Sequence, residues 1–184
     1  MITSHIDAAN AAYREFRNGN YESAIAFCDT LISYNPQIPN IYRLRADAKM
    51  NLAQYEEAIA DCNKALELDP CNSASLTRGF AHYFSYQNKE AIQDFTCFID
   101  LNRHVYHARK SLAYAYKTRA DVLHDLSRNR EAKFDYLRAL YIAQNDGDAL
   151  LIAQITPSLE AINKQKKGAD SPPNLPKGWD SCRV

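Results

Sequence analysis

A five-residue motif that contains small and apolar residues occurs four times along this chain. Each copy reads tyrosine or asparagine, two variable residues, alanine and then isoleucine, except that a lysine ends the fourth copy. The central alanines are Ala24, Ala58, Ala91 and Ala132, at intervals of 34, 33 and 41 residues. A period in the low thirties is typical of solenoids built from paired helices. The pattern therefore predicts an all-α chain whose helices stack in successive pairs.

The segment over residues 41–70 shows the physical basis of this pattern most clearly. Ala46, Ala58 and Ala65 fall where two antiparallel helices would cross most closely. A larger side chain at such a crossing overpacks the contact and costs about 1–3 kcal/mol. Pro70 is predicted to end the second helix, because proline has no N–H to donate to the preceding turn.

This segment closely resembles a tetratricopeptide repeat, a helix–turn–helix unit of about 34 residues. The resemblance extends over roughly residues 5–146 and implies a right-handed α-solenoid of about four repeats with a C-terminal capping helix. The predicted units are a repeat domain over 4–146 (repeats at about 5–38, 39–71, 72–105 and 106–146), a capping helix over 147–167 and a disordered tail over 168–184.

The third repeat and the cap depart from the regular pattern. The third repeat lacks one residue, and we place this deletion in its turn near Gln87. Arg103 occupies the position where the terminal proline of the repeat is expected. We therefore predict one longer helix from about 104 to 126, which would account for the 41-residue interval. Pro157 lies inside the predicted cap, so we expect a kink or break near residues 155–156.

In this family the first helices of successive repeats line a concave groove, and the resemblance implies that a partner peptide or helix binds there. The implied partner-binding residues are Tyr13, Phe16, Arg17, Asn40, Arg43, Asp47, Met50, Asn51, Thr77, Arg78, Phe84, Tyr114, Lys117, Asp121 and His124. Arg43, Arg78 and Lys117 favour a peptide that carries acidic groups. The alternative is that these are ordinary solvated groove residues.

Co-chaperone members of the family hold the C-terminal carboxylate of Hsp70 or Hsp90 with a clamp of two lysines, two asparagines and an arginine. The matching positions of this chain hold Ala9, Tyr13, Leu44, Ala74 and Arg78. Only Arg78 agrees, so the resemblance does not support an Hsp70/Hsp90 clamp here. A link to these chaperones would need another geometry.

Composition and motifs narrow the class of function further. Lys plus Arg and Asp plus Glu both total 22, so no global field favours nucleic acid or an acidic membrane. The chain has no apolar run of about 18 residues and no signal-peptide pattern at its start, and its cysteines form no CxxC pair. We expect a cytoplasmic protein with reduced thiols, in which Cys28 and Cys62 are small core residues.

Signatures of catalytic and metal sites are missing from the sequence. Phosphate-binding glycine loops, zinc-protease motifs and nucleophile elbows do not occur, so we expect no enzyme activity, no cofactor and no metal. His104 and His107 are three residues apart but have no third ligand to complete a metal site.

The leading functional prediction is a protein–protein interaction adaptor or scaffold. Two alternatives stay open: a chaperone or escort for a client protein in secretion or assembly, and a structural subunit that stacks on itself or on a larger complex. Trp179, the single tryptophan, lies in the predicted tail. It is compatible with a short docking motif or with an unstructured end, and the sequence leaves open whether the tail occupies the groove.

Overall fold

The computed structural model describes residues 2–71 and 73–165, and this part of the chain is helical with short connections. The elements are α1 (Ile2–Arg17), α2 (Tyr21–Tyr34), α3 (Pro39–Asn51), α4 (Tyr55–Leu68), α5 (Ala74–Phe84), α6 (Asn88–Asn102), the short 3₁₀ helix η1 (Tyr106–Ala108), α7 (Arg109–Asp125), α8 (Asn129–Asp146) and α9 (Ala149–Gln165). None of these helices is long and apolar enough to cross a membrane.

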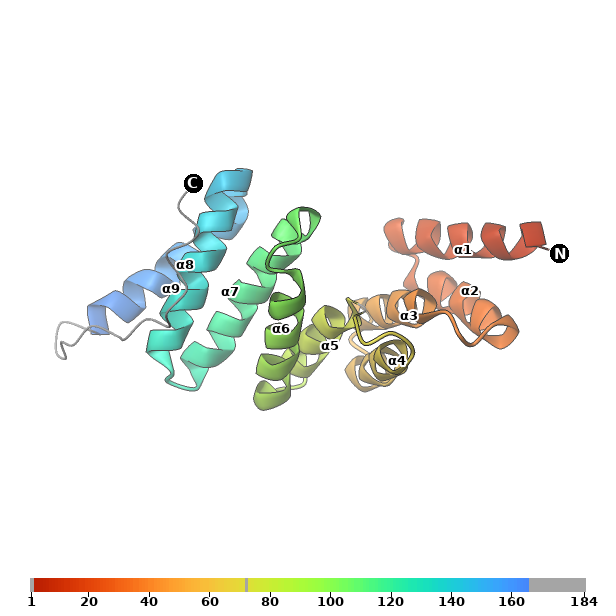
Figure 1. Cartoon of the computed structure of the whole chain (residues 1–184), viewed down its shortest axis with the longest axis horizontal. Helices are drawn as coiled ribbons and strands as arrows, with labels where there is room; N and C mark the ends of the chain where they lie inside the picture. Colours follow the sequence, from red (N-terminus) through yellow and green to blue (C-terminus); the bar gives the residue numbers. More distant parts are fainter. Residues whose placement is uncertain (1, 72, 166–184) are drawn as a thin grey trace.

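Consecutive helices pack in pairs, and the pairs stack in a row. The pairs are α1–α2, α3–α4, α5–α6 and α7–α8, and each second helix also contacts the first helix of the next pair. Figure 1 shows the resulting elongated solenoid, with α1 at one end and α9 lying against α8 at the other. The architecture is therefore the all-α solenoid with a terminal capping helix that the sequence predicts.

Small residues allow the two helices of each pair to approach closely. The repeated alanines Ala24, Ala58, Ala91 and Ala132 are all fully buried. Gly79 holds the corresponding crossing position on α5, and a Cβ atom added there would lie 2.9 Å from Cε1 of Phe95. The small side chains of the sequence pattern are thus contact points between helices, and a larger residue would force the helices apart.

Each turn inside a helix pair contains one residue with positive φ. These residues are Gly19, Ala53, Tyr86 and Ser127, with φ values of 81°, 57°, 60° and 59°. Each lies five residues before the repeated alanine, so the four turns have the same length. Only the first turn uses glycine, the residue that adopts this conformation without steric cost.

We expect Ala53→Gly to raise the free energy of unfolding by about 0.5–1 kcal/mol, because it removes a Cβ clash at positive φ and deletes only an exposed methyl group. Urea denaturation followed by circular dichroism measures the change. The opposite substitution, Gly19→Ala, is the control and should lower stability by about 1 kcal/mol. A loss of stability in Ala53→Gly would contradict this account of the turn.

The connection between the third and fourth pairs differs from the prediction. The predicted helix from about 104 to 126 is wrong at its start: α7 begins at Arg109, after the η1 turn. The chain leaves α6 after Asn102 and is extended at Val105, with φ −93° and ψ 107°. The extra residues of the 41-residue interval therefore form the η1 turn and lengthen α7 at its N-terminal end.

The residue missing from the third repeat is also not where we placed it. Gly79 precedes Ala91 by twelve residues, as Ala46 precedes Ala58, so the turn near Gln87 has its full length. The missing residue lies before Gly79 instead, because Ala58 and Gly79 are 21 residues apart whereas Ala24 and Ala46 are 22 apart. α5 begins five residues before Gly79, while α3 begins seven residues before Ala46. This shift by one residue changes which side chains of α5 face the groove.

The capping helix continues through its proline. α9 includes Pro157 without interruption, so the expected break is wrong. Leu151, Ile155, Leu159 and Ile162 form one buried face that packs with α8, and this packing keeps the segment helical on both sides of the proline. The predicted tail over 168–184, including Trp179, lies outside the described residues.

Candidate functional site

A cavity of about 510 Å³ opens between the first helices of successive pairs. We call it the central cavity. It is lined by Phe16 of α1, by Arg43, Asp47, Met50 and Asn51 of α3, by Leu76, Thr77 and Phe80 of α5 and the preceding Ser73, by Phe98 and Asn102 of α6, by His107 and Ala108 of η1, and by Ser111 of α7. Elements from all four helix pairs thus contribute to a single site.

Large apolar side chains form part of the lining of the central cavity. Phe16, Met50, Leu76, Phe80 and Phe98 line it, and Phe98 is almost completely buried. The ring of Phe80 rests edge-on against Phe95, with 5.2 Å between the ring centres and 75° between their planes. This contact with a buried ring holds Phe80 in place at the cavity.

One ion pair, Arg43 with Asp47, lines the cavity beside these apolar side chains. Nη1 of Arg43 donates to Asp47 at 2.6 Å, and the hydroxyl of Thr77 donates to the other carboxylate oxygen, also at 2.6 Å. Burial raises the pKa of the Asp47 carboxyl, while the charge of Arg43 and the hydrogen bond from Thr77 act in the opposite direction. The charge of Arg43 is therefore balanced within the cavity.

Six of the sequence-predicted site residues line the central cavity: Phe16, Arg43, Asp47, Met50, Asn51 and Thr77. The other nine lie elsewhere. Tyr13 packs against the N-terminal core, and Arg17 and Asn40 are exposed near the ends of α1 and α3. Phe84 is half-exposed and stacks on Tyr55, with 5.6 Å between ring centres.

The residues predicted on α7 form contacts of their own outside the cavity. Lys117 pairs with Asp121 at 2.8 Å, and the hydroxyl of Tyr136 donates to Asp121 at 2.7 Å. His124 lies 2.6 Å from the side-chain oxygen of Asn129, and Tyr114 packs against the C-terminal core. The cation predicted to attract a partner in the fourth repeat is thus paired with a carboxylate.

Arg78 does not face the groove, and this prediction is wrong. Its guanidinium binds both carboxylate oxygens of Asp94, at 2.9 and 2.6 Å, and also donates to Asn63 at 2.6 Å. The error follows from the missing residue, which we had placed after α5 instead of before it. With the corrected register, Ser73 and Thr77 replace Ala74 and Arg78 at the matching positions of the chaperone clamp.

The corrected register also identifies two cavity residues that sequence reasoning missed. Leu76 and Phe80 lie 33 residues after Arg43 and Asp47, the same interval that separates the repeated alanines Ala58 and Ala91. That interval was visible in the sequence. The contributions of Phe98 and His107 were not, because they depend on the path of the irregular connection around η1.

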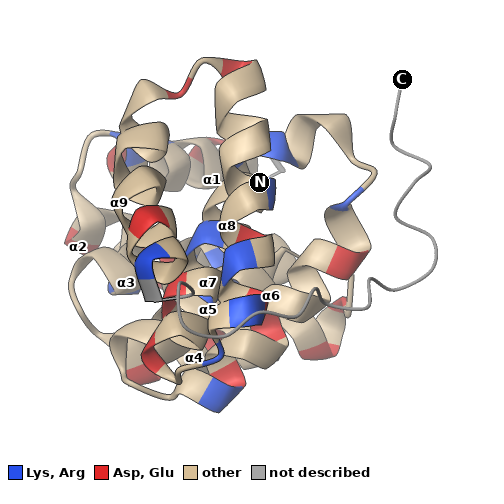
Figure 2. Cartoon of the chain, turned by 90° about the vertical axis from the view of Figure 1, so that its left-hand side faces the viewer, with Lys and Arg blue, Asp and Glu red and all other residues tan. Residues whose placement is uncertain are grey.

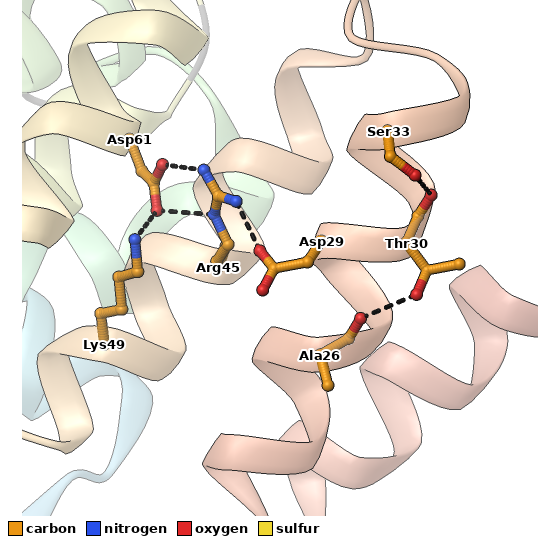
Figure 3. Close-up of polar contacts among 7 residues, drawn as sticks. All are labelled: Ala26, Asp29, Thr30, Ser33, Arg45, Lys49 and Asp61. Atoms are coloured by element: carbon orange, nitrogen blue, oxygen red, sulfur yellow. Dashed lines mark hydrogen bonds and ion pairs between the residues drawn. The ribbon is translucent and has the colours of Figure 1, made fainter.

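Arg78 belongs to a series of buried ion pairs that repeats along the solenoid. Arg45 with Asp61, Arg78 with Asp94 and Arg119 with Asp135 are each 16 residues apart and join the two helices of one pair. Each arginine also donates to the second helix of the preceding pair, as Arg45 does to Asp29 in Figure 3. These arginines hold neighbouring pairs together.

The thiols and the surface charges offer no reactive or strongly charged site in the described part of the chain. Cys28 and Cys62 are fully buried, as predicted, and burial raises the pKa of Cys28 to about 12 and that of Cys62 further. Over residues 2–71 and 73–165, no group of three or more metal-binding side chains occurs. Figure 2 shows acidic and basic residues interspersed on the helices.

Comparison with known proteins agrees with this architecture. The sequence model of the tetratricopeptide repeat matches residues 39–70. The solved second tetratricopeptide repeat domain of human RPAP3, in complex with an HSP70 peptide, is 30% identical, with a TM-score of 0.52 over 61% of this chain and 98% of that chain. The chain is a tetratricopeptide repeat protein.

Two further relatives show how far the likeness extends. The crystal structure of MamA protein has a TM-score of 0.67 at 16% identity and covers 94% of this tetratricopeptide repeat protein and 100% of MamA, which shows the fold alone. Human sperm-associated antigen 1 is 31% identical over 170 residues, 89% of this chain. The chain spans only 9–16% of the length of the sperm-associated antigen 1 proteins that it matches.

Proposed function

We propose that this tetratricopeptide repeat protein is a non-catalytic cytoplasmic adaptor that binds a segment of a partner protein in the central cavity. The observation that supports the proposal is the cavity itself, because apolar side chains from successive repeats line this one site. Its volume of about 510 Å³ lies within the usual range for specific ligand sites, about 300–1,000 Å³. The relatives support the same class of function, because solved tetratricopeptide repeat domains of RPAP3 hold HSP70 or HSP90 peptides.

A variant that fills the cavity tests this proposal. Asn51 is an exposed residue at the end of α3 and lines the cavity, so Asn51→Trp should obstruct the site without disturbing the core. Gln54→Trp, in the exposed turn three residues later and outside the cavity lining, is the matched control. Circular dichroism should show unchanged helicity in both variants.

Affinity purification with mass spectrometry identifies proteins that bind the wild type, and each candidate is then purified and titrated against both variants. A partner whose affinity falls by roughly tenfold or more with Asn51→Trp, and stays unchanged with Gln54→Trp, supports binding in the central cavity. A partner that binds all three proteins equally would refute it and place the interaction on another face of the solenoid.

A further inference from the structure

The charges around the central cavity bear on the chemistry of the partner. Three cations were predicted to attract acidic groups, and each has a carboxylate partner of its own. Arg43 holds Asp47 at 2.6 Å, Lys117 holds Asp121 at 2.8 Å, and Arg78 holds Asp94 through two hydrogen bonds. Because a carboxylate fixed by the fold already neutralises each cation, an acidic ligand would meet neutral pairs, which offer little net attraction.

The carboxylates of two of these pairs also accept hydrogen bonds from neighbouring helices. Asp47 accepts a second hydrogen bond from Thr77, which lies on the neighbouring helix α5, and Asp121 accepts one from Tyr136 on α8. Neither carboxylate can swing away to release its cation without losing a hydrogen bond to another helix. These second hydrogen bonds therefore favour the paired state.

The part of the central cavity beside the Arg43–Asp47 pair is suited to an uncharged group. The buried Phe98 lines it together with Leu76 and Phe80, which pack against the same buried cluster, and the ring of Phe80 rests on Phe95. Burying an aliphatic or aromatic side chain against such residues removes apolar surface from water and favours binding.

Polar side chains stand at the edge of the central cavity. Asn51 and His107 are exposed, and Asn102 and Ser111 are partly exposed. Amide and hydroxyl groups at this edge are suited to hydrogen bonds with the backbone of a bound segment, while its side chain enters between the rings.

We propose that the central cavity recognises an uncharged apolar side chain of the partner, of the size of leucine, methionine or phenylalanine, and does not read acidic groups. This inference rests on the proposed function and names the chemistry of its ligand. It separates this chain from its structural relatives, because the RPAP3 domain binds the acidic peptide SGPTIEEVD. It also replaces the acidic peptide that the sequence alone favoured.

Two probes of opposite chemistry test the inference on the full chain. The first is N-phenyl-1-naphthylamine, an uncharged apolar dye that becomes fluorescent in apolar surroundings. The second is the peptide SGPTIEEVD, titrated by calorimetry. Both titrations are repeated with Asn51→Trp and Gln54→Trp, at about 50 mM and about 500 mM NaCl, because salt screens charge–charge attraction and leaves apolar burial nearly unaffected.

We expect saturable dye binding with an affinity that changes less than about twofold between the two salt concentrations. It should weaken roughly tenfold or more in Asn51→Trp and stay unchanged in Gln54→Trp. No saturable binding of SGPTIEEVD is expected.

Two results would overturn the inference. Saturable binding of SGPTIEEVD that is lost in Asn51→Trp and weakens strongly with salt would show an acidic ligand in the cavity, and the proposed adaptor function would stand. Dye binding that is absent, or equal in Asn51→Trp and wild type, would show that the cavity takes no apolar group. The purified-partner titration then decides separately whether the cavity binds protein at all.

Discussion

Asp61→Ala is expected to lower the free energy of unfolding by about 3–5 kcal/mol, one of the two largest effects that we predict for a single substitution. Asp61 is 5% exposed and accepts hydrogen bonds from Arg45, including one at 2.9 Å from Nε, and from Lys49 at 2.7 Å. Figure 3 shows both cations turned toward this one carboxylate. Alanine would leave two poorly solvated cations without their buried partner.

A second carboxylate that binds Arg45 provides the control variant. Asp29 also binds Arg45, but its side chain is 56% exposed, against 6% for Asp61. Asp29→Ala should therefore cost less than about 1 kcal/mol. Both variants are compared by urea denaturation at neutral pH. Equal losses in the two variants would mean that burial of Asp61 does not determine the strength of the network.

Phe95→Ala is expected to be destabilising by about 3–5 kcal/mol, because it opens a cavity at a fully buried aromatic position. Phe95 fills the space beside Gly79 and supports the ring of Phe80. The substitution should therefore also weaken dye binding in the central cavity, since Phe80 loses the ring against which it rests. Urea denaturation measures the loss of stability, and a dye titration under conditions in which the variant is still folded measures the loss of binding.

Phe84→Ala is the matched control for this second prediction. Phe84 is 48% exposed and stacks on Tyr55 outside the central cavity. Its removal should cost about 1 kcal/mol and leave dye binding unchanged. Loss of stability in Phe95→Ala without any loss of dye binding would contradict the proposed support of Phe80.

The fold could be predicted from the sequence because its determinants recur. Ala24, Ala58, Ala91 and Ala132 each mark a crossing of two helices, and four weak signals at a regular interval form a strong one. Departures from the repeat were harder to place. The sequence shows that a residue is missing between Ala58 and Ala91, and the equal turn lengths in the structure assign it to the stretch between Ala58 and Gly79.

The candidate site could be predicted only in part, because it depends on register and on an irregular connection. On α3, where the register was correct, Arg43, Asp47, Met50 and Asn51 all line the central cavity. On α5 a shift of one residue led us to predict Arg78 in place of Leu76 and Phe80, although Arg78 is a partly buried arginine that pairs with the buried Asp94. The pairing of the cations was also not visible, since a spacing of 16 residues gives no sign of contact unless the turn geometry is known.

The path of the chain between α6 and α7 has a consequence for how such a protein changes over generations. Asn102, His107 and Ser111 stand at the edge of the central cavity, yet none of them belongs to a buried apolar cluster in the described part of the chain. Mutations there would alter what the cavity accepts at little cost to folding, whereas mutations at Phe95 or Asp61 would threaten the whole chain. The polar edge of the proposed site can therefore change at little cost to folding, whereas its apolar part is held fixed because Phe98 also belongs to the buried core.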